Sequence, residues 1–412
     1  MRVLISGGGT GGHVYPALAV CQALQARLGA APVDATSLDP LRAAPSSAAG
    51  RPRAADVGLP VASLPAQPAR GSLGAAAVLY VGSEDGVEVD LAARAGLPYR
   101  AIATGQLRGR APWTAARNLL RMAHGIRQSA AFLREFQPQV CFVTGGYVCT
   151  PVAWAAHRMG VPILIYLPDL TPGLAIRVLS RLAARVAVSF PEVAPWFPGK
   201  AVVTGYPVRR ELHAAAANRD AARAHFGLEP ATFTLLVFGG SRGARSINQA
   251  ILAALPALVE HMQVIHISGT LDWPQVAAGA AALPADRRRR YHAFAYLHDD
   301  MALALAAADL VVARAGASTL GEFPLLGLPA ILVPYPYAGQ HQDANAAYLV
   351  QRGAAIKLSD GEMGARLAPL VLDLLHNRQR LGQMTQQATA LARPQAADAI
   401  VDELLRLGAS YD

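Results

Sequence analysis

The chain has 412 residues, of which 53% are hydrophobic and only 16% are charged, and its net charge is +9 at pH 7. This length predicts two or three domains, and the hydrophobic content excludes a chain that is disordered throughout. The excess of basic over acidic residues, 37 against 28, favours an anionic partner, which is a nucleotide, a nucleic acid or a membrane surface. Cys21, Cys141 and Cys149 lie in apolar surroundings without metal-ligand spacing, so we expect buried thiols rather than a disulfide framework or a zinc site.

The N-terminal segment and the two longest uncharged runs do not have the pattern of membrane spans. Glycines begin at Gly7, too early for the apolar core of a signal peptide. Residues 136–157 and 323–340 are each interrupted by prolines and glycines, so neither predicts a continuous apolar helix of about 20 residues. We therefore expect a protein that does not span the membrane.

The first half of the chain alternates between strand and helix patterns. Residues 1–6 predict a buried strand that enters a glycine-rich turn, and residues 14–28 have helical spacing. Residues 31–76, rich in Ala, Pro, Ser and Arg without periodicity, predict a disordered insertion. After it, strands are expected at 78–82, 139–143 and 162–166, and helices at 87–95, 113–136 and 151–159. This alternation predicts a parallel sheet with both faces covered.

The same order restarts after Tyr206-Pro207. Residues 210–230 have a polar helical pattern, and a strand at 234–238 enters a second glycine-rich turn and a helix. Later strands are expected near 264–268, 310–313 and 330–334. The predicted fold class is α/β, with two Rossmann-like domains facing each other across a cleft. We place the first domain at residues 1–206 and the second at residues 207–394. A helix is expected at 395–412, and the sequence leaves open whether it packs back on the first domain.

The first glycine-rich turn, GGGTGGH, ends at His13. Its glycines let backbone N–H groups approach a phosphate or a sugar at a helix N-terminus. Together with Asp34, the turn also matches a dinucleotide fingerprint, but the second glycine turn in the other half argues against a hydride-transfer enzyme. A neutral imidazole at this position is able to take up a proton near pH 7, so His13 is the candidate base. The alternative is an exposed first-turn histidine without a role.

Four further segments follow predicted strands and bring polar groups to the cleft. Thr144–Tyr147 is a glycine-rich turn that is either a ligand contact or simply a tight turn. In the turn at 239–244, Ser241 either donates its hydroxyl to a phosphate or only caps the next helix. Residues 314–322 predict a helix N-terminus for a diphosphate, where Glu322 is either a ribose ligand or a plain first-turn glutamate. Residues 334–345 gather amide and imidazole groups that suit sugar hydroxyls.

Residues 91–134 contain eight arginines and no acidic residue. The near-helical spacing within this stretch mixes cations with large apolar side chains at Arg110, Trp113, Arg117, Leu120 and Arg121. Such a helix suits the surface of an anionic bilayer, and the alternative is an amphipathic helix with a basic solvent face. A nucleic-acid partner is disfavoured because no recognisable binding module accompanies the arginines.

Taken in order, these motifs resemble the MurG family. The resemblance covers the chain apart from roughly residues 31–76, and it rests on GGGTGGHVYPALA, GQLRG, TGGYV, GYPVR, GGSRGARSIN, DDM, RAGAST.GE and GQHQDANA. That family transfers N-acetylglucosamine from UDP-GlcNAc to the undecaprenyl-diphosphate-linked muramyl pentapeptide of peptidoglycan synthesis, with inversion. The resemblance implies a glycosyltransferase B fold, no tightly bound cofactor, no protein-bound metal, and a peripheral enzyme on the cytoplasmic face of the plasma membrane.

The resemblance also assigns roles to individual residues. It makes His13 the motif histidine and the candidate catalytic base. It implies that the donor contacts lie mainly on the second domain, with a few residues approaching from the first. These substrate-binding residues are Thr10, Gly11, Gly12, Arg209, Ser241, His298, Ala317, Ser318, Thr319, Leu320, Gly321, Glu322, His341 and Gln342. Helix N-termini and Arg209 would offset the charge of the leaving diphosphate, and the acidic pair Asp299-Asp300 is interpreted as a helix cap.

One segment departs from the family pattern. Where the family has His-Glu-Gln-Asn, this chain has Tyr166-Leu167-Pro168-Asp169, so a carboxylate replaces an amide that normally reaches the substrates. Two alternatives therefore stay open: a UDP-sugar transferase with a different lipid acceptor, and a non-catalytic scaffold of the same fold. The joint presence of His13, Glu322 and Gln342 argues against the scaffold.

Overall fold

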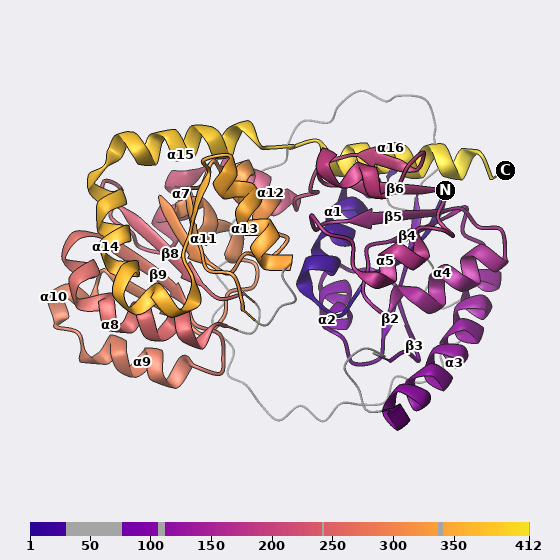
Figure 1. The fold of residues 1–412 in the computed structure, drawn as a ribbon, viewed down its shortest axis with the longest axis horizontal. Helices are drawn as coiled ribbons and strands as arrows, with labels where there is room; N and C mark the ends of the chain where they lie inside the picture. Colours follow the sequence, from indigo (N-terminus) through magenta and orange to yellow (C-terminus); the bar gives the residue numbers. More distant parts are fainter. Residues whose placement is uncertain (30–75, 106–111, 241–242, 337–340, 412) are drawn as a thin grey trace.

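The computed structural model describes residues 1–29, 76–105, 112–240, 243–336 and 341–411, and it places them in two α/β domains. In Figure 1 the two domains lie side by side, and the helices of each are arranged around its own sheet. The predicted fold class is therefore confirmed. Apart from Ala76, the predicted insertion at 31–76 lies outside the described residues.

The first domain is built on a seven-stranded parallel sheet in the order β3-β2-β1-β4-β5-β6-β7. Its strands are β1 (Arg2–Ser6), β2 (Ala77–Ser83), β3 (Tyr99–Ile102), β4 (Val140–Val143), β5 (Ile163–Leu167), β6 (Arg185–Val188) and β7 (Ala201–Val203). Its helices are α1 (Gly11–Leu28), α2 (Val87–Arg94), α3 (Pro112–Phe136), α4 (Cys149–Arg158), α5 (Leu174–Leu179) and the 3-10 helix η1 (Pro191–Trp196). The sheet grows in opposite directions from β1 and β4, so a ligand crevice is expected beyond the carboxyl ends of these two strands.

The second domain repeats this plan with six parallel strands in the order β10-β9-β8-β11-β12-β13. The strands are β8 (Thr234–Phe238), β9 (Gln263–Ile267), β10 (Tyr291–Phe294), β11 (Leu310–Ala313), β12 (Ala330–Leu332) and β13 (Ala355–Lys357). The helices are α6 (Arg210–Ala216), α7 (Arg219–His225), α8 (Arg245–His261), α9 (Trp273–Ala282), α10 (Ala285–Arg288), α11 (Met301–Ala307), α12 (Thr319–Leu326), α13 (His341–Gln351), η2 (Asp360–Glu362), α14 (Met363–His376) and α15 (Arg378–Ala390). The central strands are apolar and buried, as expected for strands covered on both faces.

Two local predictions need correction. The polar stretch at 210–230 forms two short helices, because the side chain of Asn218 accepts a hydrogen bond from Ala221 N and begins a new helix there. Asp300 stands at the start of α11, but its side chain makes no capping hydrogen bond and lies 3.3 Å from His225 Nε2 instead.

The last helix, α16 (Ala396–Ala409), leaves the second domain and runs along the first (Figure 1). Its apolar residues Ile400, Val401 and Leu404 are buried in the same core as α1. An ion pair between Arg27 of α1 and Asp402 fastens its outer face. The chain therefore crosses between the domains twice, before α6 and again before α16.

Candidate active site

His13 lies in the first turn of α1, where the first-domain glycine turn ends. Its Nδ1 is 2.8 Å from the carbonyl oxygen of Thr144, and the Thr144 hydroxyl donates to the carbonyl oxygen of His13 at 2.6 Å. Because a carbonyl oxygen only accepts hydrogen bonds, Nδ1 carries the proton in the neutral imidazole and Nε2 keeps its lone pair. The geometry therefore prepares His13 to accept a proton at Nε2.

The two glycine turns of the first domain lie backbone against backbone. A Cβ atom at Gly146 would overlap the carbonyl oxygen of Gly8, so this approach requires glycine. The Tyr80 hydroxyl donates to the carbonyl oxygen of Gly7 at 2.6 Å and holds the start of the first turn. The turns at 7–13 and 144–147 are thus one structural unit, which the sequence did not predict.

Glu88 is a functional candidate that sequence reasoning missed. It stands in the first turn of α2, is fully buried, and lies against the glycine turn. Its carboxylate accepts from Gly9 N at 3.1 Å, from Ser83 N at 3.1 Å and from the Ser83 hydroxyl at 2.5 Å. Because Gly9 N donates to Glu88, this amide is not available to a ligand. The N–H groups at the start of α1, at Gly11 and Gly12 beyond Thr10, are the ones that a helix leaves for capping groups or ligands.

On the second domain, Glu322 lies in the first turn of α12 and is buried, with 8% of its surface exposed. Burial raises the pKa of its carboxyl group, and the nearby Arg209 guanidinium and a hydrogen bond from Ser318 oppose that rise. Arg209 Nη2 is 3.7 Å from Glu322 Oε1, which is longer than a direct hydrogen bond. A desolvated carboxylate with incomplete hydrogen bonding suits a pair of ribose hydroxyls.

The segment before α12 presents mainly its backbone. Thr319 and Leu320 are buried, and the Thr319 hydroxyl donates to the carbonyl oxygen of Gly316 at 2.7 Å. These two side chains therefore stabilise the segment. The backbone N–H groups of Thr319 and Leu320 also donate within it, to the carbonyl oxygens of Gly316 and Ala317 at 3.1 Å. Ala317, Ser318 and Gly321 are partly exposed around the same helix start. Because Gly321 N donates to the carbonyl oxygen of Ser318, the N–H groups of Ala317 and Ser318 are the ones that this helix start leaves for a ligand.

Arg209 reaches across the cleft to the first domain. Its guanidinium carbon lies 4.3 Å from the centre of the Tyr15 ring, which belongs to α1. The Nε of Arg209 is buried and has no hydrogen-bond partner among the described residues. The predicted residue His298 is exposed and packs its ring 4.5 Å from that of Tyr296. Tyr15 was not identified from the sequence, because its partner is distant along the chain.

The polar segment that begins α13 also contacts the first domain. His341 Nδ1 is 2.8 Å from the Thr171 hydroxyl, and Gln342 accepts a hydrogen bond from Tyr335 N at 2.8 Å. Asn345 donates to Asp169 Oδ1 at 3.3 Å, so the carboxylate at the unusual position bonds to the opposite domain. Ser241, predicted to meet phosphate, lies outside the described residues.

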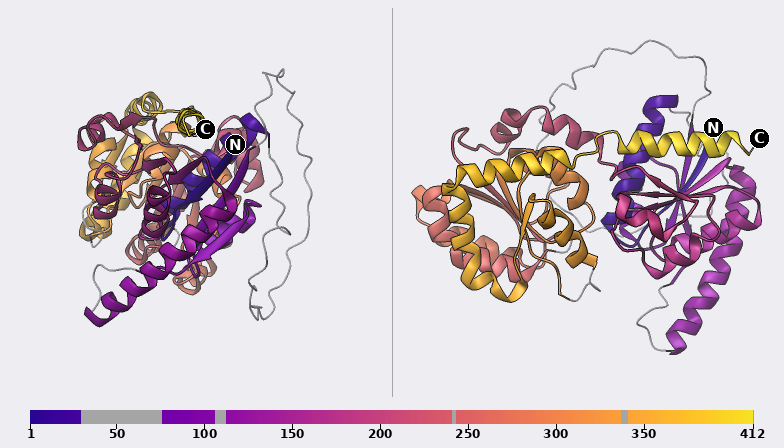
Figure 2. Two further views of the ribbon diagram at one scale, coloured as in Figure 1. Left: turned by 90° about the vertical axis from the view of Figure 1, so that its right-hand side faces the viewer. Right: turned by 45° about the horizontal axis from the view of Figure 1, so that its top comes forward.

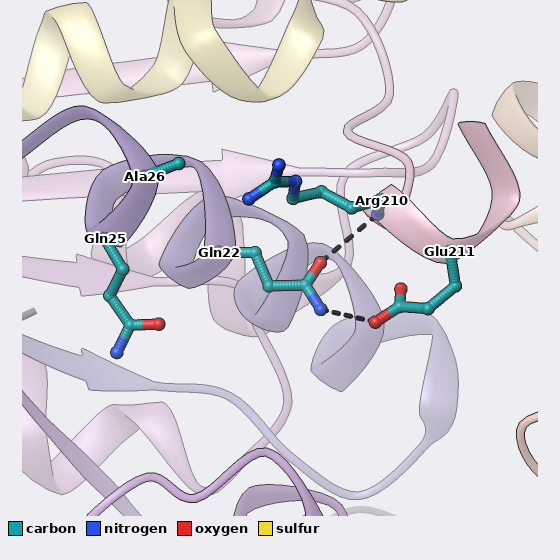
Figure 3. Close-up of a pocket in the computed structure, with 5 residues that line it drawn as sticks. All are labelled: Gln22, Gln25, Ala26, Arg210 and Glu211. Carbon is teal, nitrogen blue, oxygen red and sulfur yellow. Dashed lines mark hydrogen bonds between the residues drawn. The ribbon is translucent and has the colours of Figure 1, made fainter. Parts of the chain in front are cut away.

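A separate pocket of about 480 Å³ opens between α1 and α6 and is lined by Gln22, Gln25, Ala26, Arg210 and Glu211 (Figure 3). The Gln22 amide bridges the domains, because it donates to Glu211 Oε1 at 2.7 Å and accepts from Arg210 N at 3.2 Å. None of the predicted site residues lines this pocket. It is a contact beside the domain crossing rather than part of the cleft site.

Helix α3 carries the predicted membrane-facing residues, and Figure 2 shows it projecting beyond the body of its domain. The side chains of Trp113 and Leu120 are 81% and 74% exposed, and Leu119, which sequence reasoning missed, is 60% exposed. Arg121 is bound to Glu84 at 2.9 Å and to the carbonyl oxygen of Thr104, so it is not a free cation. Arg110 lies outside the described residues.

In the described part of the chain, no helix has both the length and the apolar character needed to cross a membrane.

Comparison with known proteins extends these observations. Two family models match the chain: the glycosyltransferase family 28 N-terminal domain over residues 72–188 and the family 28 C-terminal domain over residues 234–400. Relatives from Roseiflexus sp. (strain RS-1) and Desulforudis audaxviator (strain MP104C) are 43% and 40% identical. The alignments cover 96% and 99% of this chain and 93% and 98% of those relatives. Both are named UDP-N-acetylglucosamine--N-acetylmuramyl-(pentapeptide) pyrophosphoryl-undecaprenol N-acetylglucosamine transferase.

Solved structures agree with this match. The crystal structure of Acinetobacter baumannii MurG superposes with a TM-score of 0.69 at 25% identity, covering 98% of this chain and 99% of that chain. The UDP-GlcNAc 2-epimerase from Neisseria meningitidis, bound to UDP-GlcNAc, gives a TM-score of 0.64 at 12% identity, with 98% and 100% covered. The second likeness concerns the fold alone.

Proposed function

The chain belongs to the MurG transferases of glycosyltransferase family 28, and from this premise we propose that it moves N-acetylglucosamine from UDP-GlcNAc to a lipid-linked N-acetylmuramyl pentapeptide. It is thus a hexosyltransferase of peptidoglycan synthesis. The observation that carries the proposal is the arrangement across the cleft, with a proton acceptor at His13 on the first domain and the Arg209–Glu322 pair on the second.

The donor is proposed to bind mainly on the second domain. Glu322 accepts the ribose hydroxyls, and the N–H groups of Ala317 and Ser318, just before α12, receive the diphosphate. The segment that contains His298 lies near the uracil, and the α13 start with His341 and Gln342 meets the sugar. Arg209 supplies positive charge beside the leaving group.

The transfer step is a single displacement. Nε2 of His13 takes the proton from the acceptor hydroxyl, and the hydroxyl oxygen forms a bond to the anomeric carbon. The bond from that carbon to the UDP oxygen breaks, UDP leaves with the electron pair, and the configuration inverts. The charge that develops on UDP is offset by Arg209 and the start of α12, so no step is assigned to a protein-bound metal or a tightly bound cofactor.

The lipid anchor of the proposed acceptor implies that the enzyme works at a membrane. Because the acceptor is anchored by a polyprenyl chain, we propose that the enzyme sits on the cytoplasmic face of the plasma membrane as a peripheral protein, without a nucleic-acid partner. The exposed Trp113, Leu119 and Leu120 in the first half of α3, together with the exposed Arg117, are the proposed contact surface.

A second candidate keeps the donor and changes the acceptor to another lipid. The observation that favours it is Asp169, which replaces an amide of the family pattern and is bonded to Asn345. A carboxylate repels an anionic acceptor group more than an amide does. The non-catalytic scaffold has no such observation in its favour, because the Thr144 carbonyl oxygen engages Nδ1 of His13 and leaves Nε2 for a substrate.

The assay that decides between them incubates the purified protein with UDP-GlcNAc and a short-chain lipid-linked muramyl pentapeptide, and follows UDP release and the disaccharide product. We expect both to appear at equal rates. Saturable UDP-GlcNAc binding without transfer to this acceptor, combined with transfer to another lipid, would replace the leading proposal by the second. Binding without transfer to any lipid would favour the scaffold.

The membrane surface is tested by sedimentation with vesicles containing anionic lipid. The double variant Trp113→Ser with Leu120→Ser is expected to bind about tenfold more weakly, since two exposed apolar side chains no longer enter the interface. Leu271→Ser, at a residue of the second domain that is 73% exposed, is the matched control. Equal binding of the double variant and the wild-type chain would remove α3 as the membrane contact.

A further inference from the structure

Tyr15 stands two residues after His13 on α1 and packs against the core of the first domain, yet it also contacts the second domain. Its ring faces the Arg209 guanidinium at 4.3 Å, within the range of a cation–π contact. Its hydroxyl interacts with the side chain of Tyr296, which follows β10. On its own side of the cleft, the ring lies so close to Gly11 that a Cβ there would be 3.1 Å from Tyr15 Cε2. Tyr15 therefore connects the turn that carries His13 with two elements of the donor side.

The position of the ring affects the Arg209–Glu322 pair. A free arginine and a buried carboxylate tend to form a direct bidentate pair with N–O distances near 2.8 Å. Here the distance is 3.7 Å, and the guanidinium instead rests on the ring of Tyr15. The Nε of Arg209 is left buried without a partner in the part of the chain that the structure describes. Both groups thus keep hydrogen-bonding capacity that a direct ion pair would remove.

We propose that Tyr15 is a positioning residue that completes the donor site across the domain interface. Its aromatic face holds Arg209 away from Glu322, so that Glu322 stays available to the ribose hydroxyls and the Arg209 Nε to an oxygen of the nucleoside diphosphate. Without the ring, Arg209 collapses onto Glu322, and the donor must break that pair before it binds. This inference rests on the proposed function in one respect: it assumes that the ligand is a nucleoside diphosphate sugar.

The same contact has a consequence for turnover. Tyr15 shares α1 with His13 and packs on the glycine turn, so a donor that orders Arg209 also fixes the start of α1. Loss of the ring is therefore expected to raise the donor KM and, to a smaller extent, to lower kcat. A residue that only stabilised the fold would lower the amount of active protein without changing the donor KM.

The experiment measures the Kd of UDP-GlcNAc by calorimetry for the wild-type chain and for Tyr15→Phe, Tyr15→Leu, Arg209→Ala and the double variant Tyr15→Leu with Arg209→Ala. Tyr15→Phe keeps the aromatic face and is expected to bind within about twofold of wild type. Tyr15→Leu keeps apolar volume without the face, and its Kd is expected to rise about 5- to 30-fold, the range of a cation–π contact. In the Arg209→Ala background the same substitution is expected to have no further effect.

Two controls keep the result interpretable. Tyr411→Leu changes an exposed tyrosine near the end of the chain and is expected to bind as wild type does. Phenylalanines with increasing ring fluorination at position 15 keep the shape of the ring and weaken its negative face, so the Kd should rise stepwise with fluorination. This series tests the contact even where Tyr15→Leu does not fold.

The inference is overturned if Tyr15→Leu binds UDP-GlcNAc as wild type does, or if fluorination leaves the Kd unchanged. It is also overturned if Tyr15→Leu raises the Kd by the same factor in the wild-type chain and in Arg209→Ala. A wild-type chain that binds UDP-GlcNAc but transfers nothing would defeat the proposed function and leave the role of Tyr15 in binding intact. A wild-type chain that does not bind UDP-GlcNAc would overturn both.

Discussion

Two buried glutamates, one in each domain, occupy matching places and do different work. Glu88 and Glu322 both stand in the first turn of a helix that follows a parallel strand. Glu88 accepts hydrogen bonds from one side-chain and two backbone donors. For Glu322, the protein groups that favour its ionised form are Arg209, whose Nη2 is 3.7 Å away, and the side chain of Ser318. The number of donors supplied by the protein separates the carboxylate that holds a turn in place from the one that we propose to bind a ligand.

The comparison extends to the two sides of the cleft. In the first domain, His13, Thr144 and the glycine turns bond to one another, so this side is arranged before any ligand arrives. On the donor side, Arg209 Nε and Asn345 Oδ1 are buried without partners among the described residues. We therefore expect changes at His13 and the turns that hold it to affect turnover. Changes on the donor side, and at Tyr15, which reaches Arg209 from the first domain, should affect affinity.

The largest effect is expected from His13→Ala. Removal of the proton acceptor should lower kcat about 100- to 10,000-fold, the usual contribution of a general base. The Kd for UDP-GlcNAc should change less than threefold, because the proposed donor site lies mainly on the other domain. Steady-state kinetics and calorimetry on the same preparation measure the two quantities. A comparable loss in both would remove His13 as the base and would end the separation between the two sides.

Glu88→Gln should come next. The amide cannot accept all three hydrogen bonds, so at least one buried N–H or O–H loses its partner, and the free energy of unfolding should fall by about 2 kcal/mol. We also expect kcat to fall about tenfold as the turn before His13 loosens, with the donor Kd unchanged. Urea unfolding and kinetics measure these effects, and Asp90→Asn on the exposed face of α2 is the control. A variant as stable as the control would show that Glu88 does not hold the turn.

Glu322→Gln should have the opposite signature. The donor Kd is expected to rise about tenfold, because charged hydrogen bonds to the ribose hydroxyls are lost. The free energy of unfolding should not fall, since the carboxylate is desolvated without full compensation. Glu260→Gln, at an exposed residue of the same domain, is the control. If Glu322→Gln destabilises the chain as much as Glu88→Gln does, the two glutamates are equivalent and the comparison fails.

The smallest effect is in the pH dependence of Glu322. Burial raises the pKa of this carboxyl group above its ordinary value of 4.5. As pH rises through that interval, the unfolded chain ionises first and binds fewer protons, so this group lowers the free energy of unfolding with increasing pH. Donor affinity, which needs the carboxylate, should fall as pH decreases through the same interval. The difference between wild type and Glu322→Gln in urea unfolding at several pH values isolates the effect, and a difference that does not vary with pH would contradict it.

The fold was predictable because it depends on local patterns. A buried strand, a glycine turn and a helix open each domain, and each of these is visible within a short window of sequence. The break at Asn218 was not predicted. Residues 210–230 have one continuous polar helical pattern, and the pattern does not show that the Asn218 side chain caps a new helix there.

From the sequence, candidate site residues were found only where a motif carries the residue. His13 and Glu322 stand in recognisable turns, but Glu88 contacts Gly9 across 79 positions of sequence, and Tyr15 meets Arg209 across the domain boundary. The same limitation affected Arg121, whose partner Glu84 belongs to another element. Contacts between elements set the chemical state of a side chain, and a spacing pattern along one element does not contain them.

The two crossings of the chain between the domains have a mechanical consequence. Gly205 in the first crossing has a φ of +90°, and a Cβ there would be 2.6 Å from the Cβ of Arg393 in the second, so the two connections touch. Two connections at one place act as a hinge between the domains. They resist twisting of one domain against the other and sliding between them, but they allow the domains to open and close about the hinge. The displacement of any atom then grows with its distance from that hinge. A small angular change would leave groups near the connections almost stationary while it carries the projecting end of α3 through a wide arc.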